Sequence, residues 1–153
     1  MNGDDRYFVD SDVLLYAHDT RNEQKQRHAE AWLDWLWQSA VPHVSWQVLE
    51  EFYSNAILKM RVPPYYARLA VVAWSEWHPP DVTLGLLERA WFWSDQAKIS
   101  FWDSMIVAAA ERARCRWLLS EDFQSGREFG DLTVLNPFEH APGSLGARPQ
   151  GKV

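Results

Sequence analysis

Carboxylate side chains that could hold a metal ion occur at four well-separated places in this chain of 153 residues. Crowded carboxylates cannot all remain ionised in a confined site without a cation. A ligand set made only of oxygen atoms selects hard divalent ions such as Mg2+ or Mn2+. If the four places converge in the folded chain, they predict a site for one or two such ions. The residues are Asp10 with Asp12, Glu50 with Glu51, Asp103, and Glu121 with Asp122.

The pattern of apolar residues predicts strands and helices that would bring these carboxylates together. Strands and helices that alternate along the chain favour a mostly parallel sheet covered on both faces. In such a sheet the carboxyl ends of strands and the amino ends of helices share one edge, where ligands usually bind. All four acidic places fall at that edge. The expected strands lie at about 7–9, 42–45, 116–119 and 132–135, and the helices at about 20–40, 45–58, 65–77, 83–97 and 100–113.

Each carboxylate also has a purely structural interpretation. Asp103 can complete a capping box, Asp10 is a suitable helix N-cap, and Asp122 is a suitable turn residue. Glu50 and Glu51 are neighbours on a helix and point in different directions, so only one of them can face the site. Four acidic positions at one sheet edge are less easily explained by independent coincidences.

Four sequence motifs resemble those of PIN-domain ribonucleases, and in particular the VapC toxins of bacterial toxin–antitoxin pairs. Their order and spacing match from about residue 7 to residue 138, including Asn136-Pro137-Phe138. One such motif alone is weak evidence, but four in the same order are specific. The motifs are Phe8 to Tyr16, Ser45 to Phe52, Ser100 to Ile106, and Leu118 to Phe123.

This resemblance implies a PIN-like three-layer α/β/α sandwich with a mostly parallel central sheet. It implies an endoribonuclease that uses Mg2+ or Mn2+, acting as the toxin of a type II toxin–antitoxin system, with RNA as substrate and a cognate antitoxin as partner. The chain departs from the family at Asp12, where asparagine is usual. The catalytic and metal-binding residues implied are Asp10, Glu51, Asp103 and Asp122, and Asp12, Ser120 and Glu121 are possible auxiliary residues.

The net charge of −6 does not argue against an RNA substrate. Five of the negative charges belong to Asp10, Asp12, Glu51, Asp103 and Asp122, so the remaining surface is nearly balanced. Basic residues near the first two motifs could contact the RNA backbone, although such residues are commonly exposed in any protein. The candidates are Arg21, Lys25, Arg27, Lys59 and Arg61.

The helix expected at about 20–40 carries more aromatic surface than one buried stripe can hold. Thr20 and Glu23 predict a capping box at its start. At about 100° per residue, Trp35 lies about 120° from the apolar face that contains Ala29 and Leu33. An exposed tryptophan beside apolar neighbours predicts an interface, so we expect a homodimer and a groove for an antitoxin helix.

Length and composition favour one domain, expected at residues 1–139 and followed by a mobile tail at 140–153. The chain is 47% hydrophobic, and no apolar run approaches the roughly 18 residues of a membrane span, so no membrane contact is expected. The acidic start of the chain and the single cysteine, Cys115, favour a cytoplasmic protein.

Two other functions remain open from the sequence alone. Asp10 and Asp12 after a strand also resemble the signature of haloacid dehalogenase-like phosphohydrolases, whose remaining residues would have to be Lys98 and the pair Gly130-Asp131. The second alternative is a non-catalytic PIN-fold binding module that uses its tryptophan-rich faces to bind partners.

Overall fold

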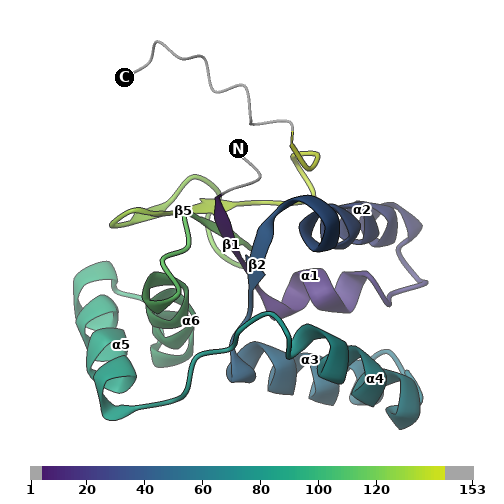
Figure 1. Ribbon diagram of the computed structural model, residues 1–153, viewed down its shortest axis with the longest axis horizontal. Coiled ribbons are helices and arrows are strands. Elements are labelled where there is room, and N and C mark those ends of the chain that lie inside the picture. Colours follow the sequence, from purple (N-terminus) through teal and green to yellow (C-terminus); the bar gives the residue numbers. More distant parts are fainter. Residues whose placement is uncertain (1–4, 144–153) are drawn as a thin grey trace.

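The computed structural model describes residues 5–143, and within them a sheet with the strand order β2-β1-β3-β5-β4 lies at the centre (Figure 1). Strands β2, β1, β3 and β5 are parallel, and β4 is antiparallel to β5. The carboxyl ends of the parallel strands therefore lie at one edge of the sheet. The strands are β1 (Arg6–Val9), β2 (Val41–His43), β3 (Trp117–Leu119), β4 (Glu128–Phe129) and β5 (Leu132–Leu135).

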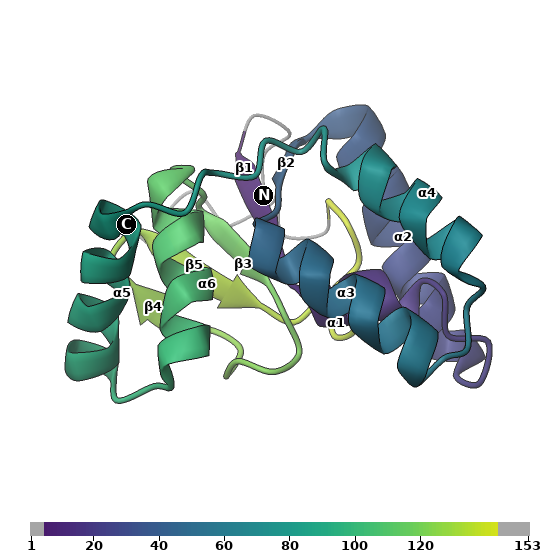
Figure 2. The ribbon, with the colours of Figure 1, turned by 90° about the horizontal axis from the view of Figure 1, so that it is seen from below.

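The helices form two groups beside the sheet (Figures 1 and 2). Helices α5 and α6 pack closely against each other on one side, and α1 to α4 pack together on the other. The result is the three-layer α/β/α architecture expected from the sequence. The helices are α1 (Ser11–Tyr16), α2 (Glu23–Ser39), α3 (Trp46–Leu58), α4 (Pro64–Trp74), α5 (Leu84–Ala97) and α6 (Phe101–Arg112).

The core is built around the two central strands. Tyr7, Phe8 and Val9 of β1 are fully buried although consecutive side chains point to opposite faces, so both faces of the sheet are covered. Leu118 and Leu119 of β3 are buried in the same way. This burial holds β1 and β3 side by side, with Val9 in register with Leu119. The residues that follow these two strands are therefore neighbours.

Most of the predicted elements are present, with four differences, the first being that the short helix α1 was not among the expected helices. The capping box at Thr20 was a wrong prediction, because α2 begins at Glu23 and the Asn22 side chain accepts the hydrogen bond from Lys25 N–H. The helix expected to reach residue 77 ends at Trp74. The two-residue strand β4, joined to β5 by a turn in which Gly130 has a positive φ, was not predicted.

Trp35 was predicted to point away from the core, but it packs against the core instead. Its ring packs edge-on against Tyr7 of β1 with 5.3 Å between centroids, and against Trp32 at 5.8 Å. The prediction failed because it left Trp32 out of the apolar face. Trp32 is fully buried, and it extends the apolar face about 40° beyond Leu36 towards Trp35.

The expected domain limits are only partly covered by the structure. Residues 140–143 are described, whereas residues 144–153 of the predicted tail lie outside the described range. Within residues 5–143, no helix combines the length and the hydropathy needed to cross a lipid bilayer.

Candidate active site

Asp10 and Ser120 meet where β1 and β3 end. The Asp10 N–H donates to the carbonyl of Leu119 at 3.0 Å, which extends the pairing of the strands by one residue. The Ser120 hydroxyl then donates to Asp10 Oδ2 at 2.8 Å, while Asp10 Oδ1 accepts the N–H of Ser11 at 2.7 Å. Asp10 is thus the N-cap of α1 as well as a member of the acidic site. Both residues are buried.

Asp12, in the first turn of α1, holds the turn that follows β3. Its Oδ2 accepts the N–H groups of Glu121 at 2.8 Å and Asp122 at 3.2 Å, and the Ser120 hydroxyl lies 3.5 Å away. Its Oδ1 is buried and has no hydrogen-bond partner in the part of the chain that the structure describes. One carboxylate oxygen from each of Asp10, Asp12 and Asp122 lies within 4.8 Å of the others.

Glu51 reaches the site from α3. Its Oε2 accepts the Ser11 hydroxyl at 2.9 Å, and its Oε1 accepts the Gln47 side-chain amide at 3.0 Å. Gln47 also donates to the carbonyl of Trp102 at 3.2 Å, which ties the amino ends of α3 and α6 together. Glu50, the neighbouring carboxylate, is exposed.

Asp103 lies in the first turn of α6, and its side chain is exposed. Ser100 caps this helix as the sequence predicted, and its hydroxyl accepts the N–H of Asp103 at 3.1 Å. The Asp103 carboxylate acts on Asp122 electrostatically. The pKa of Asp122 is raised by burial and by the negative charges of Glu121, Asp103 and Glu51. The structure therefore brings Asp10, Asp12, Glu51, Asp103 and Asp122 to one edge of the sheet.

Burial and mutual repulsion make negative charge costly at this edge. Burial, together with the charges of Asp122 and Glu51, raises the pKa of Asp10 to about 7 against the hydrogen bonds from Ser120 and Ser11. Burial and the charges of Asp10 and Asp122 likewise raise the pKa of Asp12 well above its ordinary value. Among residues 5–143, no Lys, Arg or His side chain forms an ion pair with these three aspartates. The all-oxygen donor set and the unpartnered Asp12 Oδ1 fit a hard divalent cation.

Two of the basic residues that were predicted to contact RNA form ion pairs with carboxylates of this chain. Lys25 pairs with Glu121 and packs over the rings of Tyr16 and Phe138. Its hydrogen bonds to Glu121 and to the Tyr16 hydroxyl raise its pKa against the effect of burial. Arg21 pairs with Asp19 at 2.9 Å. The other three candidates, Arg27, Lys59 and Arg61, are exposed.

Ser11 and Gln47 were not singled out from the sequence. Gln47 precedes Glu51 by one helical turn, a spacing at which side chains on a helix contact each other. That signal was available once Glu51 was a candidate. The contact between Ser11 and Glu51 joins residues 40 positions apart, and no local pattern predicts it.

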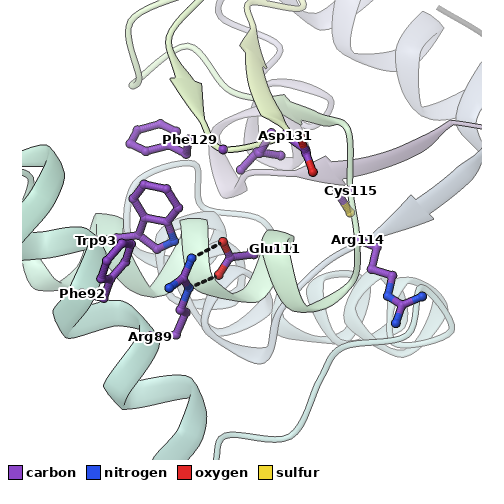
Figure 3. A pocket seen from close by; sticks show the side chains of 10 residues that line it. Arg89, Phe92, Trp93, Glu111, Arg114, Cys115, Phe129 and Asp131 are labelled. Carbon is purple, nitrogen blue, oxygen red and sulfur yellow. Dashed lines mark hydrogen bonds and ion pairs between the residues drawn. The ribbon is translucent and has the colours of Figure 1, made fainter.

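A separate cavity of about 590 Å³ lies at the opposite edge of the sheet, between α5, α6 and the β4–β5 hairpin (Figure 3). Gly130 and Asp131 line it just before β5 begins, whereas the acidic residues follow the ends of β1 and β3. Lys98 caps the carboxyl end of α5. Gly130 and Asp131, which a haloacid dehalogenase-like mechanism would need beside Asp10, therefore lie at the other end of the strands.

Comparisons with known proteins agree with this architecture. The model of the PIN domain family matches residues 7–126. Among solved structures, Mycobacterium tuberculosis VapC20, a sarcin-ricin loop cleaving toxin, is similar with a TM-score of 0.52 and 23% identity, over 76% of this chain and 89% of the other. VapBC2 from Rickettsia felis, bound to a DNA fragment from its promoter, is similar with a TM-score of 0.58 and 13% identity, over 84% of this chain and 96% of the other.

The curated proteins contain no significant match to this chain. The family match nevertheless spans the strands β1, β2 and β3 and every acidic residue gathered at the sheet edge. The chain therefore belongs to the PIN-domain family.

Proposed function

We propose that this protein is a metal-dependent endoribonuclease that hydrolyses RNA phosphodiester bonds and acts as the toxin of a type II toxin–antitoxin system. The observation that carries the proposal is the gathering of Asp10, Asp12 and Asp122 within 4.8 Å, with a buried Asp12 oxygen that has no partner in residues 5–143. Membership of the PIN-domain family supports the same activity.

The proposed catalytic and metal-binding residues are Asp10, Glu51, Asp103 and Asp122. These carboxylates would hold Mg2+ or Mn2+, which would supply an activated water and stabilisation of the negative charge that develops on the phosphate. The buried Asp10 carboxylate is held by two hydrogen bonds, and Glu51 is held between Ser11 and Gln47, so neither needs to reorganise. Asp103 and Asp122 are exposed, so an RNA substrate could reach them.

The activity is tested by incubating the purified protein with single-stranded and structured RNA in Mg2+, in Mn2+ or in EDTA. We expect internal cleavage of RNA that EDTA abolishes and that is lost in Asp10→Asn. Glu50→Gln should retain the activity, because the Glu50 side chain is exposed and, within residues 5–143, forms no ion pair. Absence of metal-dependent cleavage across a broad RNA pool, with release of phosphate from phosphomonoesters instead, would overturn the proposal in favour of a phosphohydrolase.

A cognate antitoxin and a second copy of the chain are the proposed protein partners. Helix α4 presents an apolar face to solvent, formed by Tyr65, Tyr66, Leu69 and Val72, each more than half exposed. These residues fall within about 120° on the helix, so they form one continuous stripe. Such a stripe is typical of a surface that another protein covers.

The partner proposal is tested by sedimentation at micromolar concentration, alone and with the protein encoded by a small reading frame beside the gene. We expect a dimer that Leu69→Asp weakens. A monomer at these concentrations that also binds no such protein would contradict both proposed partners.

A further inference from the structure

We propose that Asp12 is itself a cation ligand and that its negative charge strengthens metal binding in this chain. The inference rests on the proposed function, since it assigns a further residue to the same site. It concerns the two oxygens of one side chain, which have different surroundings.

The Oδ2 atom of Asp12 stabilises the turn that follows β3. Oδ2 accepts the backbone N–H groups of Glu121 and Asp122 and so fixes the turn that presents the Asp122 carboxylate. This task needs an acceptor but no charge, because an asparagine carbonyl oxygen could accept the same two hydrogen bonds. The structural task therefore leaves the charge of Asp12 unexplained.

The Oδ1 atom of Asp12 makes no corresponding hydrogen bond among residues 5–143. Oδ1 is buried and lacks a hydrogen-bond partner among residues 5–143, and the whole side chain is only 9% exposed. A buried carboxylate oxygen without a partner costs free energy, and more so beside two other carboxylates. An asparagine could place its NH2 donor in the position of Oδ1 and remove one negative charge from the acidic cluster. In a metal-free protein asparagine would therefore be the better residue.

A cation reverses this preference. Asp12 offers an oxygen within 4.8 Å of oxygens from Asp10 and Asp122, and no basic side chain of the described residues pairs with any of the three. A divalent ion there would satisfy the buried oxygen and offset the repulsion among the three charges. The amide nitrogen of an asparagine would do neither, because Mg2+ and Mn2+ favour oxygen ligands.

The test is Asp12→Asn, with Mn2+ binding measured by isothermal titration calorimetry and thermal unfolding followed in EDTA. We expect Mn2+ affinity to fall by roughly 10- to 100-fold, the range seen when residues that support a metal site are removed. In EDTA the variant should unfold at the same temperature as the wild type or higher. The asparagine oxygen can still accept the N–H groups of Glu121 and Asp122, and the repulsion between carboxylates is reduced. Glu50→Gln, which removes a nearby charge outside the site, should change neither quantity.

Asp10→Asn separates failure of this inference from failure of the proposed function. If Asp10→Asn loses Mn2+ binding while Asp12→Asn keeps the affinity of the wild type, Asp12 only accepts backbone hydrogen bonds. The inference is then overturned, although the metal site itself is confirmed. If the wild type itself binds no Mn2+, the proposed function fails and the inference fails with it.

A measurement on the wild type covers the case in which Asp12→Asn does not fold. With aspartate labelled at the carboxyl carbon, addition of Mg2+ should move the NMR signals of both Asp10 and Asp12. A signal of Asp12 that stays in place while that of Asp10 moves would overturn the inference.

Discussion

Replacing His43 with leucine should make the protein more resistant to acid. His43 lies at the end of β2, is 6% exposed, and neither of its ring nitrogens has a hydrogen-bond partner in the described part of the chain. Burial, together with the positive charge of Arg6 on β1 and the neighbouring His78, lowers the pKa of His43 to about 4. The folded protein therefore keeps this ring neutral at a pH where the unfolded chain protonates it.

The sign and size of the effect follow from the two pKa values. Well above pH 6.5, the ordinary pKa of the ring, His43 is neutral in both states and contributes nothing to pH dependence. As the pH falls from 6.5 towards 4, only the unfolded chain takes up the proton, so stability is lost. A difference of this size is worth about 3 kcal/mol when fully developed, and about 2.5 kcal/mol at pH 4.5.

The assay is urea unfolding at pH 7.5 and pH 4.5 in EDTA, for the wild type and for His43→Leu. Asp10 acts in the opposite direction, because its pKa is raised to about 7 and its protonation in the folded state adds stability as the pH falls. The difference between the two proteins removes that contribution. We expect the wild type to lose about 2.5 kcal/mol more than His43→Leu between the two pH values. Equal losses in the two proteins would refute the reasoning.

Three further changes test other parts of the structure. Asp103→Asn should leave stability in EDTA unchanged or raise it, while the Mg2+-induced rise in melting temperature shrinks and RNA cleavage disappears; equal Mg2+ shifts with cleavage retained would remove Asp103 from the site. Lys25→Met breaks a half-buried ion pair with Glu121 and should lower the free energy of unfolding by about 1 kcal/mol; an unchanged urea midpoint would contradict this. Trp32→Phe leaves two backbone carbonyls after β5 without their indole donor and should cost about 2 to 3 kcal/mol in the same assay, whereas a loss below 0.5 kcal/mol would mean that water replaces it.

The gathering of acidic residues at one edge of the sheet was predictable from the order of strands and helices along the chain. Apolar runs indicated β1, β3 and β5, and parallel strands must place the residues that follow them at one edge. This is how Asp10 and the segment from Ser120 to Asp122 could be expected near each other. The two-residue strand β4 gave no comparable signal, since its two residues are too few to show any alternation.

The contacts inside the site were not predictable, because they depend on side chains that approach each other only after folding. The hydrogen bonds from Glu121 and Asp122 to Asp12 join residues about 110 positions apart. The pairing of Lys25 with Glu121 is of the same kind, and it gives a structural role to a residue expected to contact RNA. Sequence patterns locate charged residues, but they do not say which charges the fold pairs.

Diffraction from a crystal soaked in Mn2+ tests the central claim most directly, because the anomalous signal of manganese locates the ion without reference to activity. We predict a peak among the carboxylates of Asp10, Asp12 and Asp122, at the edge where β1 and β3 end, with protein oxygens about 2 Å from the ion. The peak should vanish in crystals of Asp10→Asn. A well-ordered crystal without a peak at this edge, or with manganese bound only elsewhere, would contradict the account.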